Sequence, residues 1–195
     1  WLLCRALERS FPFLLAHSGS PLSPEESARA ERLIRRRENG EPIQYILGSA
    51  PFRGLEFEVG PGVLIPRPET ELLVELALSL LPNDDFTLLD WGTGSGCIAA
   101  SILLERPRAR ALMAERNPQA LAGAWRNLRR HEVLGRSLLL HSQAPEDLPV
   151  VAECDLVVSN PPYIPTEALA GLMREVRDFE PRMALDGGPD GMDCY

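Results

Sequence analysis

The chain has 195 residues, a net charge of −8 and 45% hydrophobic residues, a composition typical of a soluble globular domain with a small additional part. It contains no lysine, which excludes a Schiff-base lysine and a phosphate-loop lysine, and its acidic charge argues against stable nucleic-acid binding. No apolar run reaches the roughly 20 residues of a membrane span, and no Cys or His spacing suggests a metal site, so we expect neither membrane nor metal as a partner.

Residues 1–45 are expected to form a small helical domain. Ser23-Pro24-Glu25-Glu26 predicts a helix start with a serine N-cap, a proline in the first turn and a glutamate that closes a capping box. Asn39-Gly40 predicts the end of that helix, because glycine readily adopts the left-handed conformation. Residues 1–5 contain neither an initiator Met nor a targeting pattern, so we interpret the N-terminus as truncated.

Residues 46–66 change period and are expected to form a β-hairpin linker. Apolar and polar residues alternate over 52–59 around Gly54, and Pro61-Gly62 precedes the apolar run Val63-Leu64-Ile65.

Residues 67–195 alternate helical and strand patterns. One helix is expected from the spacing of Leu72, Leu73, Leu76, Ala77 and Leu80. Further helices are expected over 98–104 and from Asn117-Pro118 to about Leu134, and strands over 87–90, 109–114, 138–140 and 155–159. This alternation predicts an α/β fold with a parallel sheet covered on both faces, whose ligands bind at the carboxyl ends of the strands.

A glycine loop, Asp90-Trp91-Gly92-Thr93-Gly94-Ser95-Gly96, follows the first of these strands. Its G-x-G-x-G spacing lets the backbone turn sharply and approach a ligand, although dinucleotide-binding domains use a similar loop. The loop lacks a third glycine at the spacing that pyrophosphate-binding loops use. The second strand ends in Glu115, whose carboxylate can accept hydrogen bonds from both ribose hydroxyls. These features favour a nucleoside without phosphates, such as S-adenosyl-L-methionine. Asp90 is expected either to hold the loop through its amides or to face the amino-acid end of the cofactor.

The run Ser159-Asn160-Pro161-Pro162-Tyr163 follows the last predicted strand, and its two prolines hold a rigid, extended backbone. The Asn160 side-chain oxygen and the Pro161 carbonyl can accept two hydrogen bonds from one planar NH2 group, on which Tyr163 can stack. The lone pair of such a nitrogen is delocalised. Acceptors that raise its electron density and align it with a sulfonium methyl group would lower the barrier to methyl transfer. The predicted target is an amide or an exocyclic amine.

The chain resembles the HemK/PrmC family of protein-(glutamine-N5) methyltransferases over nearly its whole length. The resemblance rests on the glycine loop, on Asn160 to Tyr163, and on the runs 42–48, 61–71 (Pro-Gly-Val-Leu-Ile-Pro-Arg-Pro-Glu-Thr-Glu), 180–182 and 184–188. It implies a Rossmann-like methyltransferase sheet behind a helical domain and a hairpin linker. It also implies methylation of the glutamine in the Gly-Gly-Gln motif of peptide chain release factors, with S-adenosyl-L-methionine as cofactor.

The resemblance also implies roles by position. Gly92 to Gly96 and Glu115 would bind the cofactor, Asn160 would contact cofactor and substrate, and Pro161, Pro162 and Tyr163 would shape the glutamine pocket. Arg67 and Glu69 would lie near the pocket mouth.

The chain departs from the family pattern at several positions. Trp91 stands where an aliphatic residue is commoner, and Glu115 stands where an Asp is usual. Residues 142–145, Ser-Gln-Ala-Pro, stand where some members have an acidic and an aromatic residue near the adenine. Family members continue past Tyr195 with strands that complete the sheet. We therefore expect a C-terminus without those strands, which leaves the last strand as an exposed edge.

Two other functions stay open. An amino-methyltransferase acting on a nucleic-acid base (N6-adenine type) can share Asn-Pro-Pro-Tyr, but it needs a basic channel for the phosphates. A non-catalytic fragment could bind cofactor without turnover. Under the leading hypothesis we expect a monomer that acts on a release factor in the cytoplasm, or in the mitochondrion of a eukaryotic source.

Overall fold

The N-terminal part of the chain is helical, as its capping pattern predicts. The computed structural model describes residues 1–81, 85–144, 147–148 and 154–195. Its first helices are α1 (Leu2–Leu7), α2 (Phe11–Ala16), α3 (Pro24–Glu38) and α4 (Ile43–Leu47). The Glu26 amide donates to Ser23 Oγ at 3.2 Å and the Ser23 amide donates to the Glu26 carboxylate at 2.9 Å, which confirms the predicted capping box. Gly40, with φ +90°, follows the end of α3.

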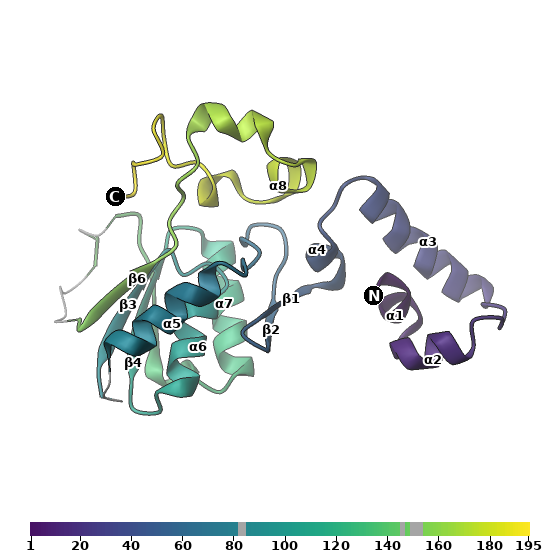
Figure 1. The fold of residues 1–195 in the computed structure, drawn as a ribbon, viewed down its shortest axis with the longest axis horizontal. Helices are drawn as coiled ribbons and strands as arrows, with labels where there is room; N and C mark the ends of the chain where they lie inside the picture. The colour runs from purple at the N-terminus through teal and green to yellow at the C-terminus, as the bar shows by residue number, and fades with distance from the viewer. Residues whose placement is uncertain (82–84, 145–146, 149–153) are drawn as a thin grey trace.

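A hairpin joins these helices to the rest of the molecule (Figure 1). Strand β1 (Ser49–Phe52) pairs antiparallel with β2 (Leu55–Glu58), and Arg53 and Gly54 form the turn with φ +48° and +73°. The predicted hairpin is therefore present. The run Val63-Leu64-Ile65 is not a strand; it forms a loop in which Val63 and Ile65 are buried.

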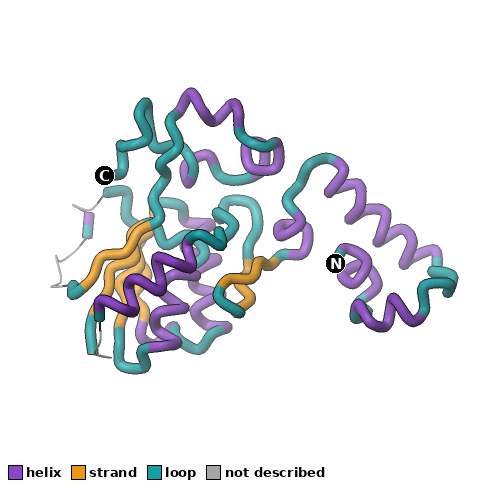
Figure 2. Tube along the Cα trace, in the orientation of Figure 1, coloured by secondary structure: helices purple, strands orange, loops and turns teal. Residues whose placement is uncertain are grey.

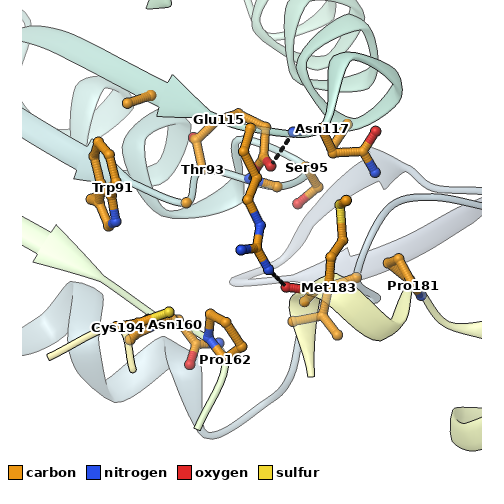
Figure 3. A pocket seen from close by; sticks show the side chains of 18 of the residues that line it. Trp91, Thr93, Ser95, Glu115, Asn117, Asn160, Pro162, Pro181, Met183 and Cys194 are labelled. Carbon is orange, nitrogen blue, oxygen red and sulfur yellow. Dashed lines mark hydrogen bonds between the residues drawn. The ribbon is translucent and has the colours of Figure 1, made fainter. Parts of the chain in front are cut away.

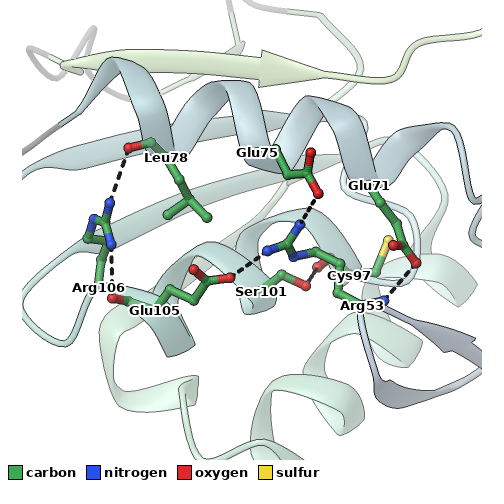
Figure 4. A network of polar contacts seen from close by, with 8 residues as sticks. All are labelled: Arg53, Glu71, Glu75, Leu78, Cys97, Ser101, Glu105 and Arg106. Atoms are coloured by element: carbon green, nitrogen blue, oxygen red, sulfur yellow. Dashed lines mark hydrogen bonds and ion pairs between the residues drawn. The ribbon is translucent and has the colours of Figure 1, made fainter.

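The tip of the hairpin is tied to two helices, α5 (Thr70–Leu80) and α6 (Cys97–Glu105), as Figure 4 shows. The Arg53 amide donates to the Glu71 carboxylate at 2.9 Å. The Arg53 guanidinium pairs with Glu75 at 3.4 Å and with Glu105 at 2.7 Å. One arginine thus holds the hairpin against both helices.

A parallel sheet carries the glycine loop. Its strands are β3 (Thr87–Trp91), β4 (Arg110–Glu115), β5 (Ser137–His141) and β6 (Leu156–Ser159), in the order β5-β4-β3-β6. Helix α7 (Pro118–Arg130) joins α5 and α6 on one face of the sheet, and one core unites side chains from all three helices with side chains from β3, β4 and β6 (Figures 1 and 2). This arrangement confirms the predicted parallel α/β fold.

The expectation that helices cover both faces is wrong for the described residues. Leu138 on β5 and Val157 on β6 are 53% and 61% exposed, because the helices that contact the strands share one core on the opposite face. Strand β6 lies at an edge of the described sheet, as expected.

Two details of the helices also differ from expectation. In α5 the contacts with α6 and the sheet bury Val74, Ala77 and Leu78. Three leucines of the predicted apolar face are instead more than half exposed: Leu72, Leu76 and Leu80. Helix α7 begins at the predicted Asn117 cap but ends at Arg130, because Glu132 adopts φ +60°.

The C-terminal part of the chain runs above the carboxyl ends of the strands. Its short elements are η3 (Thr166–Gly171), α8 (Arg174–Phe179) and η4 (Arg182–Ala184), while η1 (Leu134–Arg136) precedes β5. None of the helices described in residues 1–195 is both long and apolar enough to cross a membrane.

Candidate cofactor and acceptor site

The glycine loop turns from β3 into α6 through left-handed conformations. Gly92, Gly94 and Gly96 have φ of +74°, +55° and +79°, which favours glycine at each position. A Cβ on Gly92 would meet no atom within 4 Å, and one on Gly94 would meet only the Gly92 carbonyl at 3.9 Å. A Cβ on Gly96 would press on Met113 and Ala124 at 3.3 and 3.4 Å. The first two glycines therefore open the loop to a ligand, while the third allows close helix packing.

A cavity of about 450 Å³ lies over this loop (Figure 3), within the roughly 300–1,000 Å³ usual for ligand sites. It brings together most of the predicted site residues: Arg67, Gly92, Thr93, Gly94, Ser95, Glu115, Asn160, Pro161 and Pro162. Four others do not line it: Glu69, Asp90, Gly96 and Tyr163. Among the described residues, no group of His, Cys, Asp and Glu could hold a metal ion.

Glu115 ends β4 beside the glycine loop. One carboxylate oxygen accepts the Gly94 amide at 2.9 Å and the other accepts the Asn117 amide at 2.8 Å, the second bond being visible in Figure 3. Each oxygen keeps a free lone pair for a ribose hydroxyl. Glu115 is thus suited both to shape the loop and to bind a nucleoside.

Asp90 lies beneath the loop and is fully buried. Its Oδ2 accepts the Thr93 hydroxyl at 2.7 Å and the Ala99 amide at 3.3 Å, while Oδ1 has no hydrogen-bond partner. Burial raises the pKa of this carboxyl to about 6, an effect that the Thr93 hydrogen bond opposes. Of the two predicted roles, this position supports holding the loop.

The Asn160 side chain is oriented by Thr70, the first residue of α5. Its Nδ2 donates to the Thr70 hydroxyl at 3.2 Å, and Thr70 itself is buried. Since the NH2 end is engaged, Oδ1 is the atom left to accept a hydrogen bond at the cavity. The preceding Ser159 hydroxyl donates to the Trp91 carbonyl at 2.7 Å, which ties residues 160–163, the predicted reacting loop, to β3.

A second cavity of about 500 Å³ adjoins the first. Tyr163, which is 57% exposed, and Glu69 line this second cavity. Arg67, Asn160 and Pro161 line both cavities. Asn160 and Pro161, the predicted hydrogen-bond acceptors, therefore lie where the two cavities meet.

Segment 61–71 leads from the hairpin into the first turn of α5 and forms part of the wall of both cavities. Its Gly62 carbonyl accepts the Asn117 side-chain amide at 2.7 Å. Its Arg67 pairs with Glu180, which is buried and also accepts the Ile65 amide. Burial, and after it the charge of this carboxylate, raises the pKa of the Tyr45 hydroxyl, which donates to the Val63 carbonyl at 2.6 Å.

A buried amide links the hairpin to the glycine loop. Asn127 on α7 is fully buried; its Nδ2 donates to the Ser95 carbonyl at 2.9 Å and the Glu58 carbonyl at 3.0 Å. Its Oδ1 accepts the Glu58 amide at 2.7 Å. Nothing in the sequence indicates a supporting role for Asn127, Thr70 or Glu180, because their partners lie far away along the chain.

The positions that depart from the family pattern also reach the first cavity. Trp91, Ser142, Gln143 and Ala144 line it, while Pro145 lies outside the described residues. Across the cavity, the Arg116 guanidinium donates to the Met183 carbonyl in η4.

Comparisons with known proteins cover both the helical part and the sheet. Residues 1–48 match the PrmC N-terminal domain, and residues 69–175 match the methyltransferase small domain. The release factor glutamine methyltransferase of Geobacter sulfurreducens is 47% identical over all 195 residues, which cover 67% of that protein. That of Moorella thermoacetica is 45% identical over 195 residues, which cover 68% of it. A solved precorrin-6y C5,15-methyltransferase from Geobacter metallireducens GS-15 is 30% identical over 49% of each chain, with a TM-score of 0.43.

Proposed function

Because the chain belongs to the release factor glutamine methyltransferase family, we propose that it methylates the side-chain nitrogen of the Gly-Gly-Gln glutamine in a peptide chain release factor. The observation that carries this proposal is the place of Asn160. Its side-chain oxygen is left free by the bond to Thr70, beside Pro161 and at the junction of both cavities.

The first cavity fits S-adenosyl-L-methionine. Gly92 and Gly94 leave room for the ligand, and Glu115 offers carboxylate lone pairs at the end of β4. When bound, the cofactor supplies an electrophilic methyl group on its sulfonium. Gly92, Thr93, Gly94, Ser95 and Glu115 would hold it, and Asp90 and Gly96 would support the loop from below.

The reacting loop would present the glutamine. The Asn160 Oδ1 and the Pro161 carbonyl would each accept one hydrogen of its NH2 group. This pairing fixes the plane of the amide and raises electron density on its nitrogen. Pro162 holds the loop extended, and Tyr163, Arg67 and Glu69 would contact the residues flanking the glutamine from the second cavity.

We also propose a separate role for each of three parts of the chain. Residues 1–45 would recognise the release factor, residues 46–66 would link the parts, and residues 67–195 would carry the methyltransferase site. The protein would act as a monomer in the cytoplasm, without stable binding to nucleic acid or membrane.

Methyl transfer to a purified release factor tests the proposal. Radiolabelled cofactor is expected to label the factor in the presence of the chain. Replacing the glutamine of its Gly-Gly-Gln motif by alanine is expected to abolish the label. Label that persists after this change would contradict the proposal, and a steep salt-dependent affinity for DNA or RNA would favour methylation of a base instead.

Cofactor binding separates the enzyme from a non-catalytic fragment. Calorimetry is expected to show binding of S-adenosyl-L-methionine by the 195-residue chain, and labelling of the factor is expected to accompany it. Binding without any labelling would favour the fragment.

A further inference from the structure

The backbone that follows the two prolines is bridged to the glycine-rich segment 185–191. The Ile164 amide donates to the Leu185 carbonyl at 3.0 Å, and the Gly187 amide donates to the Ile164 carbonyl at 2.9 Å. Together they form a parallel bridge between Ile164 and Asp186. Prolines at 161 and 162 have no amide hydrogen, so this bridge supplies backbone support that the loop itself cannot make.

Gly187 lies directly against the reacting loop. A Cβ at this position would stand 2.8 Å from the Pro162 carbonyl oxygen and 2.8 Å from the Tyr163 Cα. It would also stand 2.9 Å from the Gly191 carbonyl oxygen. All three neighbours are backbone atoms, so no side-chain rotation can relieve the contact. Any larger residue at 187 must displace the loop or segment 185–191.

Polar contacts hold the two segments together from the solvent side. The Thr166 hydroxyl donates to the Asp186 carboxylate at 2.6 Å, and the Thr166 amide donates to the Gly188 carbonyl at 2.8 Å. The same carboxylate accepts the Gly188 amide at 3.2 Å and the Arg182 guanidinium at 3.0 Å. Asp186 therefore fixes the glycine turn and the residues after the reacting loop at once.

We infer that segment 185–191 is a positioning element for the reacting loop, with Gly187 packed directly against the backbone of Pro162 and Tyr163. None of its residues needs to touch the substrate. The segment sets the backbone of Pro162 and Tyr163, and through it the direction of the Pro161 carbonyl. Only the effect on catalysis rests on the proposed function. The contact between segment 185–191 and the reacting loop, here called the brace, is a property of the fold.

Amide hydrogen exchange tests the brace without requiring turnover. In the 195-residue chain, Gly187→Ala is expected to speed exchange at Ile164 and Thr166 by about tenfold, while exchange at Gly92 to Gly96 stays unchanged. Gly171→Ala is the matched control, since a Cβ there meets nothing within 4 Å. Exchange at Ile164 that is the same in both variants would overturn the inference.

A second variant keeps the test decisive if Gly187→Ala does not fold. Thr166→Val removes only the hydroxyl that donates to Asp186 and is expected to speed exchange at Ile164 by about threefold. Unchanged exchange at Ile164 in this variant would overturn the inference as well.

Kinetics separate positioning from general damage. Gly187→Ala is expected to lower kcat by about tenfold or more while the Kd of S-adenosylhomocysteine stays within about twofold. Loss of cofactor affinity parallel to the loss of kcat would contradict positioning. If the unsubstituted chain fails to methylate a release factor, the proposed function is wrong. The exchange experiment then still shows whether segment 185–191 supports the reacting loop.

Discussion

Glu180 holds Arg67 across 113 positions of the chain: Nη2 of Arg67 donates to Oε1 of Glu180 at 2.5 Å. The Glu180 side chain is 1% exposed, and its second oxygen accepts the Ile65 amide at 3.1 Å. Because Arg67 lines both cavities, this one carboxylate fixes the wall that they share.

Glu180→Ala is expected to lower the free energy of unfolding by about 1–3 kcal/mol, since it leaves the buried Ile65 amide without an acceptor. Glu180→Gln keeps an acceptor oxygen and is expected to cost less. Urea denaturation measures both. Glu31→Ala, which removes an exposed ion pair with Arg35, is the control and is expected to cost about 0–1 kcal/mol. Equal losses for Glu180→Ala and Glu31→Ala would show that the buried carboxylate does not support the wall.

Asp90 predicts a pH dependence of stability. Its pKa rises from 3.8 to about 6 on folding, so between these values the folded chain binds more protons than the unfolded chain. The contribution of Asp90 to the free energy of unfolding therefore decreases as the pH rises from about 4 to about 6. Asp90→Asn lacks this term, so its stability relative to the unsubstituted chain is expected to increase over the same interval.

Denaturation at several pH values without added cofactor measures that difference. Asp178→Asn is the control with the opposite sign, because the hydrogen bond from Arg177 lowers the pKa of Asp178. Its stability relative to the unsubstituted chain is expected to fall as the pH rises through the acidic range. An Asp90→Asn difference that does not vary with pH would mean that this carboxyl titrates normally in the folded chain.

Thr70→Val is expected to lower kcat by about five- to tenfold, because it removes the acceptor that orients the Asn160 side chain. The KM for the release factor and the Kd for the cofactor are expected to change by less than about twofold. Thr70→Ser restores the hydroxyl and should recover most of the rate. A Thr70→Val enzyme with unchanged kcat would show that Asn160 does not need this bond.

Glu115→Ala is expected to weaken binding of S-adenosylhomocysteine on the order of 10- to 100-fold, as measured by calorimetry. The change removes the acceptor of the Gly94 and Asn117 amides together with the oxygens proposed for the ribose. Glu115→Gln retains one acceptor oxygen and should give an intermediate affinity. Glu167→Ala, in η3 and away from both cavities, should bind like the unsubstituted chain. If Glu115→Ala also binds normally, another group recognises the nucleoside.

Local patterns predicted those parts of the fold that neighbouring residues determine. The capping box at Ser23 depends on contacts over three positions, and the turn of the glycine loop depends on the left-handed conformations that its own glycines adopt. The buried face of α5 does not: a helical period fits both Leu72 and Val74, and only packing against α6 and the sheet selects Val74. The end of α7 likewise depends on the left-handed Glu132, which the spacing of apolar residues does not indicate.

The candidate site divides in the same way. Sequence motifs predicted Asn160, Glu115 and the glycine loop as parts of the site, and in the structure all three border one cavity. Thr70 and Glu180 were missed as supports because their partners lie 90 and 113 positions away. Glu180 stands in the run 180–182 that the family resemblance includes, but its sequence context alone contains nothing that points to Arg67.

Asn127 ties the hairpin to the glycine loop. Since one buried amide bonds both Glu58 in the hairpin and Ser95 in the glycine loop, a ligand that moves the hairpin must also displace the loop or break these bonds. Thermodynamic linkage is reciprocal, so whatever a bound protein partner does to cofactor affinity through this amide, the cofactor does equally to partner affinity. The order in which the two ligands arrive then changes the path of assembly but leaves its total free energy the same.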